Sequence, residues 1–348
     1  MQEVQTANVG QHHATIALRE PGEGLVTWHI GMWVTAATLS DGVLGAPLLG
    51  LEEDTLEVDH PQVLWDGQGY LMVATHETGL AGVAFDADGT PHSDVRMLLS
   101  TDEPLWPDLA VHGDDDPVVI WSRPNEIRGA SVGEAFETVQ PIPAITGLEN
   151  TVTPTVRASP LGLIASWADG RGETSGVPIQ HLDTNGAVVG PSFEVDRLPS
   201  IDETPRPALA VRADGGFAVA WRYQHVGTAA AAWVRLYDAA DQALIELSLH
   251  DTGPARRPVL ATDGETLFVA WEGIEADGHH VRMRLYDFGD LTPLTDIIKV
   301  SEANARAERP YVTVVPDGDG GLYGVVAWES PEPGGSIRVV RMRTFTWR

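Results

Sequence analysis

Two pairs of histidines share one spacing, and imidazole is a side chain that can bind a metal or move a proton. His13 and His29 lie 16 residues apart, as do His60 and His76. Each pair is centred on a glycine-containing turn, so we expect its members to face each other across a hairpin, with Cβ atoms about 5 Å apart. Imidazole is a common metal ligand and a general acid or base. We therefore predict a site for a divalent metal (zinc, manganese, iron or copper), or an acid–base site, at these four histidines.

Two alternatives to this site stay open. The histidines could instead cap strands or bond to loop carbonyls, which are structural roles. A shift of register by one residue would put His12 in the place of His13. The corresponding positions elsewhere in the chain are not histidine, so the repeated pattern described below does not itself require imidazole there.

A set of arginines forms a second group with chemical potential. Three of them begin successive copies of the repeated unit, in a chain whose net charge is −28. Planar guanidinium groups bind carboxylate, sulfate or phosphate through paired hydrogen bonds. Alternatively, Glu272 and Glu329 could pair with them as struts between neighbouring units. The candidate ligands of an anion are Arg206, Arg222, Arg257 and Arg309.

The tryptophans divide into a periodic set and an irregular set. Six of them end the second strand of a repeated unit, which indicates packing in the core. Trp33, Trp106 and Trp233 break this pattern and lie near the end of the molecule where the histidines and arginines are expected. An exposed indole there could stack on a sugar ring or an aromatic ligand.

An internal repeat reveals the elements that must position these side chains. Each unit has an apolar strand, a glycine-rich turn, a second strand ending in tryptophan, and a third strand after a polar loop. The steps between the residues that begin the units are 47, 46, 47, 53, 51 and 52. A period near 50 with four short strands per unit is typical of propeller blades. The units begin at His13, His60, Trp106, Thr153, Arg206, Arg257 and Arg309.

The repeat predicts an all-β fold, a single seven-bladed β-propeller domain over residues 1–348. The last unit lacks a fourth strand, and residues 3–7 resemble the strand that ends the sixth unit. We expect the N-terminal strand to complete the last blade, because closure removes the exposed edges of an open ring. The blades are expected at about 12–52, 60–100, 106–142, 152–196, 205–248, 256–301, and 309–348 plus 1–8.

The second strands end in a recurrent Val-Ala-Trp, as in Val219–Trp221 and Val269–Trp271. With the proline near most first strands, this pattern resembles the repeats of bacterial β-propeller proteins, many of them secreted. The resemblance implies a secreted or periplasmic protein, and we expect any signal peptide to have been removed from this chain. It implies no single function, because such propellers include lectins, lyases, hydrolases and scaffolds. Oligogalacturonate lyases and carotenoid-cleaving oxygenases are seven-bladed and hold a His-ligated metal, but no motif of either family occurs here.

The composition limits the partners. The chain has 50 acidic and 22 basic residues, which argues against binding to nucleic acid and to anionic membrane surfaces. No apolar run approaches the roughly 20 residues that cross a bilayer. The chain has no cysteine, which excludes disulfides and thiolate chemistry. We expect a monomer without membrane insertion.

Three functions remain open from the sequence. The first is a propeller that binds a carbohydrate or small anionic ligand at its axial face. The second is an enzyme, a lyase or hydrolase with or without a metal, that acts on an anionic substrate such as a uronic-acid oligosaccharide. The third is a scaffold for protein interactions.

Overall fold

The computed structural model describes most of the chain, in segments separated by short gaps. They are residues 3–5, 11–30, 33–50, 58–76, 78–92, 96–100, 105–133, 136–146, 148–149, 151–171, 174–199, 206–223, 229–249, 253–276, 278–302, 306–331 and 338–348. No helix among these residues is long and apolar enough to cross a membrane.

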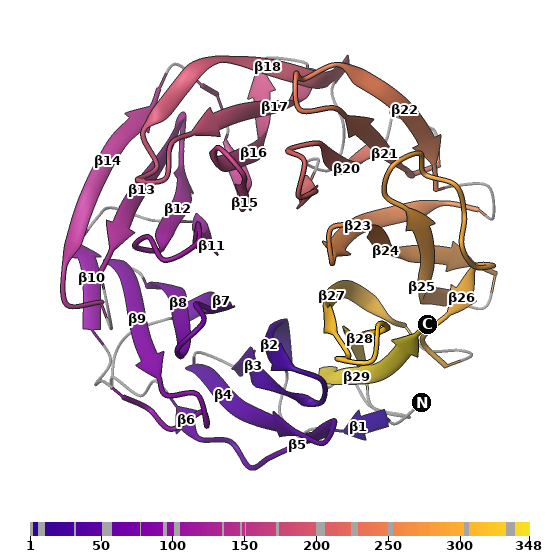
Figure 1. The fold of residues 1–348 in the computed structure, drawn as a ribbon, viewed down its shortest axis with the longest axis horizontal. Coiled ribbons are helices and arrows are strands. Elements are labelled where there is room, and N and C mark those ends of the chain that lie inside the picture. The colour runs from indigo at the N-terminus through magenta and orange to yellow at the C-terminus, as the bar shows by residue number, and fades with distance from the viewer. Residues whose placement is uncertain are drawn as a thin grey trace.

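Seven antiparallel sheets surround a central axis in the described part of the chain, and each sheet is one blade (Figure 1). Blade 1 contains β2 (Gln11–Glu20), β3 (Glu23–Ile30), β4 (Trp33–Ser40) and two outer pieces, β5 (Val43–Leu44) and β6 (Leu49–Gly50). Blade 2 contains β7 (Val58–Trp65), β8 (Tyr70–His76), β9 (Gly79–Phe85) and β10 (Arg96–Ser100). Blade 3 contains β11 (Leu105–Ala110), β12 (Val118–Arg123), β13 (Glu126–Val132) and β14 (Val139–Ile145). Blade 4 contains β15 (Val152–Ser159), β16 (Gly162–Arg171), β17 (Thr174–Leu182) and β18 (Val188–Pro199).

The remaining three blades complete the circle. Blade 5 contains β19 (Ala208–Val211), β20 (Phe217–Tyr223), β21 (Ala231–Tyr237) and β22 (Ala243–Ser248). Blade 6 contains β23 (Ala255–Thr262), β24 (Thr266–Glu275), β25 (Gly278–Asp287) and β26 (Ile298–Lys299). Blade 7 contains β27 (Glu308–Pro316), β28 (Leu322–Pro331), β29 (Arg338–Trp347) and β1 (Glu3–Gln5). The predicted seven-bladed propeller is therefore confirmed.

The ring closes through the N-terminal strand, as predicted. Strand β1 lies antiparallel to β29, with Val4 opposite Met342. The N-terminal strand thus becomes the outer strand of a blade whose other strands end the chain (Figure 1). Residues 6–8 of the predicted closing segment lie outside the described residues.

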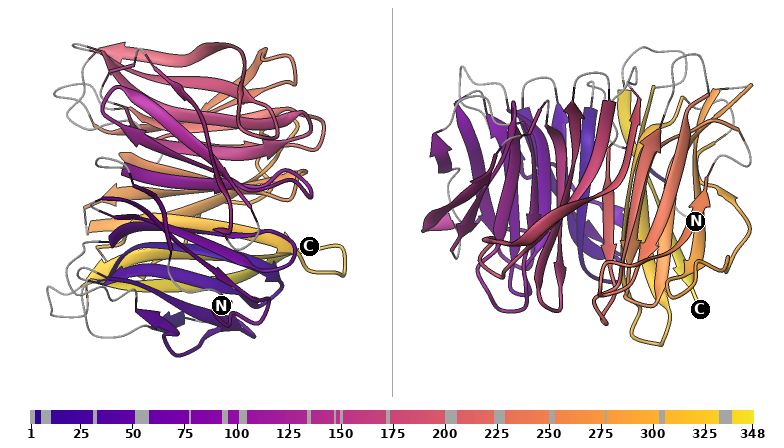
Figure 2. Two further views of the ribbon diagram at one scale, coloured as in Figure 1. Left: turned by 90° about the vertical axis from the view of Figure 1, so that its left-hand side faces the viewer. Right: turned by 90° about the horizontal axis from the view of Figure 1, so that it is seen from above.

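The hydrophobic core lies between blades rather than at the axis. The side views show the sheets packed face to face around the ring (Figure 2). Strands β8 and β20 read as nearly continuous apolar runs and are buried along their length, because a neighbouring blade covers each face. The buried clusters each join two blades; one combines Ile164 and Ile179 of blade 4 with Phe217 of blade 5. The periodic tryptophans Trp28, Trp121, Trp167, Trp221, Trp271 and Trp328 are all buried in these interfaces.

Most first strands carry a β-bulge near the axial end. In blade 6, Arg256 pairs with Glu272 and Val259 pairs with Ala270, so the inner strand has one extra residue. Its bulged residue Arg257 has a φ of 45°, in the left-handed region that side chains other than glycine rarely adopt. The equivalent φ angles are 53° at His13, 52° at His60, 45° at Trp106, 49° at Thr153 and 52° at Arg309.

Proline follows the residue that begins the unit in every blade except the first. At a bulge, its missing N–H removes a donor that would have no ladder partner. A bulge also bends the strand and redirects its side chains. In the six bulged blades, the residue that begins the unit is therefore removed from the regular alternation of its strand.

Deleting residues 1–8 removes the outer strand of blade 7 and leaves the edge of β29 without its hydrogen-bonding partner. We expect the deletion to cost several kcal/mol of stability. Thermal unfolding followed by circular dichroism measures the loss. Deleting residues 1–2 alone is the matched control, because it leaves Glu3–Gln5 in place; equal melting temperatures for both deletions would contradict the closure.

Candidate functional site

One end of the central channel holds a cavity of about 230 Å³, and the residues that begin the seven units all line it. Six of these residues lie at a bulge with a positive φ, and Arg206 of blade 5 lies just before β19, whose register is regular. All seven reach the cavity although they are spread over almost 300 positions of the chain. Deeper in the channel, Arg157 and Asp108 form an ion pair of 2.8 Å on the cavity wall, near Tyr311. The seven lining residues are His13, His60, Trp106, Thr153, Arg206, Arg257 and Arg309.

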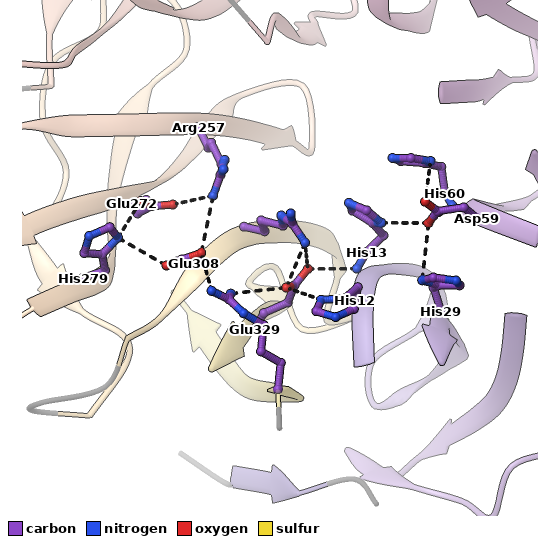
Figure 3. Close-up of polar contacts among 12 residues, drawn as sticks. His12, His13, His29, Asp59, His60, Arg257, Glu272, His279, Glu308 and Glu329 are labelled. Carbon is purple, nitrogen blue, oxygen red and sulfur yellow. Dashed lines mark hydrogen bonds and ion pairs between the residues drawn. The ribbon is translucent and has the colours of Figure 1, made fainter. Parts of the chain in front are cut away.

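Asp59 gathers three of the four predicted histidines (Figure 3). Its carboxylate lies 3.0 Å from His13 Nδ1, 3.2 Å from His60 Nδ1 and 3.4 Å from His29 Nδ1. The rings of His13 and His60 stack with centroids 4.2 Å apart, and Trp106 packs edge-on against His60 at 5.3 Å. The cluster combines two blades, because His13 and His29 belong to blade 1 and the other two to blade 2.

At neutral pH, the members of this cluster differ in charge: Asp59 is ionised and His60 is neutral. Burial, reinforced by the nearby His13, lowers the pKa of His60 to about 3. Burial lowers the pKa of His29 as well. Burial alone would raise the pKa of Asp59, but the hydrogen bond from His13 and the fields of His60 and His29 hold it well below its usual value. An ionised carboxylate therefore contacts a neutral imidazole beside the cavity.

His76 does not join this cluster, and the prediction that it does is wrong. It pairs with Val58 across the hairpin, and its Nδ1 accepts a hydrogen bond from the backbone N–H of Thr78 at 3.1 Å. The spacing of 16 misled us, because blade 2 has Ala74 where other blades have tryptophan, and Thr75 is the true counterpart of His29. The bulge also displaces the first pair, so that His12 rather than His13 lies opposite His29.

Two of the predicted arginines are paired with glutamates of their own blades. Arg257 Nη1 lies 3.1 Å from Glu272, and Arg309 Nη1 lies 3.1 Å from both oxygens of Glu329. The expected pairing with Glu272 and Glu329 is therefore present, but within a blade rather than between neighbouring units; the contact of Arg257 that crosses to blade 7 is the longer one to Glu308, at 3.9 Å. Each glutamate is 1% exposed, so each arginine also compensates a buried charge.

Arg206 differs from its two neighbours. Within the described residues, no carboxylate lies at ion-pair distance from its guanidinium group. Burial and the like charges of Arg257 and Arg309 lower the pKa of Arg206 to about 10. It stays protonated at neutral pH, in a cavity that it shares with both of those arginines. Arg222 lies outside the cavity lining and is 3% exposed, so it sits behind this surface.

Glu329 connects blade 7 to blade 1 at the site. It accepts hydrogen bonds from the His13 backbone N–H at 2.9 Å and from His12 Nδ1 at 3.0 Å. Burial would raise its pKa, but the bond from His12 and the charge of Arg309 lower it to about 2. This carboxylate therefore fixes the bulge that presents His13 to the cavity.

A further acidic residue extends the network toward blade 6. Glu308 contacts Arg338 at 2.9 Å, His279 at 3.6 Å and Arg257 at 3.9 Å. Figure 3 shows the resulting run of alternating charges from Glu272 to Glu329 behind the cavity. The histidines line the cavity from blades 1 and 2, and Arg206, Arg257 and Arg309 line it from blades 5, 6 and 7.

The three irregular tryptophans do not share one place. Trp106 lines the cavity. Trp33 is 48% exposed but is absent from that lining, and Trp233 packs against the core between blades 4 and 5. Only Trp106 is therefore positioned, among the described residues of this set, to contact a ligand in the cavity.

Sequence reasoning missed Asp59, Glu308 and the role of His279. Asp59 and Glu308 each immediately precede a residue that begins a repeated unit. That position pairs with the end of the second strand, as Glu308 does with Glu329. A search for acidic residues one position before each unit would have found both.

Comparison with known proteins identifies the fold only. No protein-family model matches the sequence, and no curated protein does. A protein of unknown function from Dyadobacter fermentans has a TM-score of 0.58 at 12% identity, over 99% of this chain and 98% of its own. A protein from Lactobacillus plantarum has a TM-score of 0.52 at 14% identity, with 83% and 85% covered. Hydrazine synthase from Kuenenia stuttgartiensis has a TM-score of 0.50 at 16% identity, with 76% and 74% covered.

Replacing Glu329 by glutamine tests its role as a charged support of the site. The pKa of Glu329 is lowered from 4.5 to about 2 on folding, so it stabilises the protein above pH 4.5 and loses this effect as the pH falls toward 2. We expect Glu329→Gln to cost about 3 kcal/mol at pH 7, and the gap to wild type to narrow by about 2 kcal/mol at pH 3.

Urea unfolding of both proteins at the two pH values measures this difference. Glu20→Gln is the control, because Glu20 is an exposed partner of Arg19 and should contribute less than about 1 kcal/mol. A gap between Glu329→Gln and wild type that is independent of pH would contradict the assigned role.

Proposed function

We propose that the axial cavity binds a small anionic ligand whose carboxylate, sulfate or phosphate group is held by Arg206, Arg257 and Arg309. The observation that carries this proposal is Arg206, a partly buried guanidinium in the cavity with no carboxylate at ion-pair distance among the described residues. Burial first, and then the like charges of Arg257 and Arg309, lower its pKa, so the ionised form of Arg206 is destabilised in the cavity. An anion between the three groups would remove that repulsion.

The charge of the cavity supports this proposal. The whole chain has a net charge of −28, yet four arginines and two histidines line this small volume. The only carboxylate among its described lining residues is Asp108, which already pairs with Arg157. A local cationic surface attracts anions at close range even in a protein that is acidic overall.

The size and the aromatic wall of the cavity narrow the ligand class. A volume of about 230 Å³ is smaller than the roughly 300–1,000 Å³ of sites for drug-sized molecules. Trp106 adds one apolar ring next to the charged groups. A single uronic acid or a short hydroxycarboxylate combines these properties, since each offers a carboxylate for arginine and a compact body for the indole face.

Anion binding predicts a rise in melting temperature with citrate, galacturonate or sulfate. Saturation to 100 times the dissociation constant adds about 2.7 kcal/mol of stability. We expect Arg206→Gln to weaken binding at least about 10-fold, because it removes a charge-assisted pair of hydrogen bonds. Isothermal titration calorimetry measures the affinities directly.

Arg19→Gln is the matched control, because Arg19 is paired with Glu20 on the surface outside the cavity and its loss changes the net charge equally. Equal anion affinities for wild type, Arg206→Gln and Arg19→Gln would show that the anion binds elsewhere, and the proposal would fail.

The contact between imidazole and carboxylate favours a second candidate, an acid–base enzyme acting on an anionic substrate. An imidazole that donates its Nδ1 proton to Asp59 keeps an unprotonated Nε2, which can accept a proton from a substrate. The arginines would then hold the substrate carboxylate while His13 or His60 removes a neighbouring proton, as in a lyase reaction on a uronic-acid oligosaccharide. Incubation with polyuronates distinguishes the candidates: a lyase generates unsaturated, ultraviolet-absorbing ends, a hydrolase generates reducing ends alone, and a binding protein generates neither.

A further inference from the structure

We propose that His13, Asp59 and His60 bind one divalent transition-metal ion at the wall of the axial cavity. The metal would occupy the space between the two Nδ1 atoms and the carboxylate, taking the place of the protons they share. The metal site itself stands on the geometry of these three residues. Its role toward an anion rests on the proposed function of the same cavity.

The distances between the donor atoms fit a metal ion. One ligand atom from each of the three residues lies within 4.8 Å of the others. Asp59 Oδ1 lies 3.0 Å from His13 Nδ1, and Asp59 Oδ2 lies 3.2 Å from His60 Nδ1. Donors about 2.1 Å from a metal are separated by about 3.0 Å at octahedral angles and about 3.4 Å at tetrahedral angles. Each carboxylate oxygen therefore already has one imidazole nitrogen at the separation of two ligands of one ion.

A third imidazole faces the same carboxylate with a buried nitrogen. His29 Nδ1 is buried and has no hydrogen-bond partner among the described residues, although Asp59 Oδ1 is 3.4 Å away. A buried polar atom without a partner costs free energy unless a ligand satisfies it. His29 is not part of the closest group of three, so it would join as a fourth ligand by rotating toward the ion.

The backbone holds the three ligands in place. Asp59 Oδ1 accepts a hydrogen bond from the His60 N–H at 2.7 Å, which fixes the carboxylate over the bulge. The Thr75 hydroxyl donates to the Asp59 carbonyl at 2.7 Å. Glu329 accepts from the His13 N–H at 2.9 Å on the other side of the cluster. Such supporting contacts orient ligands and strengthen metal binding.

The donor set indicates the kind of ion and its reactivity toward ligands. Two imidazoles and one carboxylate suit ferrous iron, manganese or zinc and leave coordination positions open. His13 and His60 line the same cavity as Arg206, Arg257 and Arg309. The open positions are thus accessible to an anion that the arginines hold, and a hydroxycarboxylate such as a uronic acid could contact both.

Titration of metal-free protein with zinc or manganese chloride tests the site. We expect one ion per chain, a higher melting temperature with the ion, and at least about a 10-fold loss of affinity in Asp59→Asn. His60→Ala should abolish saturable binding. Cobalt(II) gives a second readout, because imidazole coordination changes its visible spectrum in wild type and not in His60→Ala.

Two variants make the result decisive. His92→Gln is the control, because His92 and Asp86 form a similar pair at 3.1 Å that is exposed and outside the axial cavity. Asp59→Asn preserves side-chain volume and keeps the test valid if His60→Ala unfolds. Wild type that binds neither zinc nor manganese at millimolar concentration, or an Asp59→Asn protein with wild-type affinity, would overturn the site.

The same samples separate this site from the proposed function. Anion affinity is measured with and without saturating zinc. If the ion binds where we propose, zinc raises the affinity for galacturonate in wild type and not in Asp59→Asn. If metal binding fails while Arg206-dependent anion binding persists in metal-free protein, the metal site alone is refuted; if the metal binds and anions do not, only the function is refuted.

Discussion

The structure of the site depends on one backbone constraint, the β-bulge at the axial end of the first strands. A regular strand would point alternate residues into the interfaces between blades. In six of the seven blades, the extra residue and its positive φ instead direct one side chain to the channel; blade 5 presents Arg206 there without a recorded bulge. Each non-glycine residue with such a positive φ costs about 1–3 kcal/mol of strain. This conformation persists only where the surroundings hold it, as the Glu329 carboxylate holds the His13 backbone.

The ring repeats this backbone, but the chemistry is confined to sectors. Blades 1 and 2 contribute histidines, blades 5, 6 and 7 contribute arginines, and blades 3 and 4 contribute Trp106 and Thr153. Glu272 and Glu329 compensate the charges of Arg257 and Arg309. Arg206 has no carboxylate at ion-pair distance among the described residues. Sevenfold geometry therefore concentrates unlike side chains in one small volume, and their differences, rather than the fold, determine what that volume can bind.

The fold could be predicted from the sequence because burial between blades imposes a periodic pattern, with tryptophan ending six of the second strands. The site could be predicted only in part. His13, His29 and His60 lie together, but His76 was misplaced because Ala74 interrupts the tryptophan pattern in blade 2. The position of Asp59, directly before the residue that begins blade 2, could be found from the sequence. That this position turns toward the histidines depends on the backbone angles of the bulge, which the spacing does not specify.

A crystal structure of the protein with selenate tests the central claim, that the axial cavity is an anion site, most directly. Selenium scatters anomalously, so its position can be found without assuming a ligand pose. The account predicts one anomalous peak in the cavity, within hydrogen-bond distance of the Arg206 guanidinium and near Arg257 and Arg309. An empty cavity in crystals that bind selenate elsewhere, with Arg206 paired to a carboxylate of the protein, would contradict it.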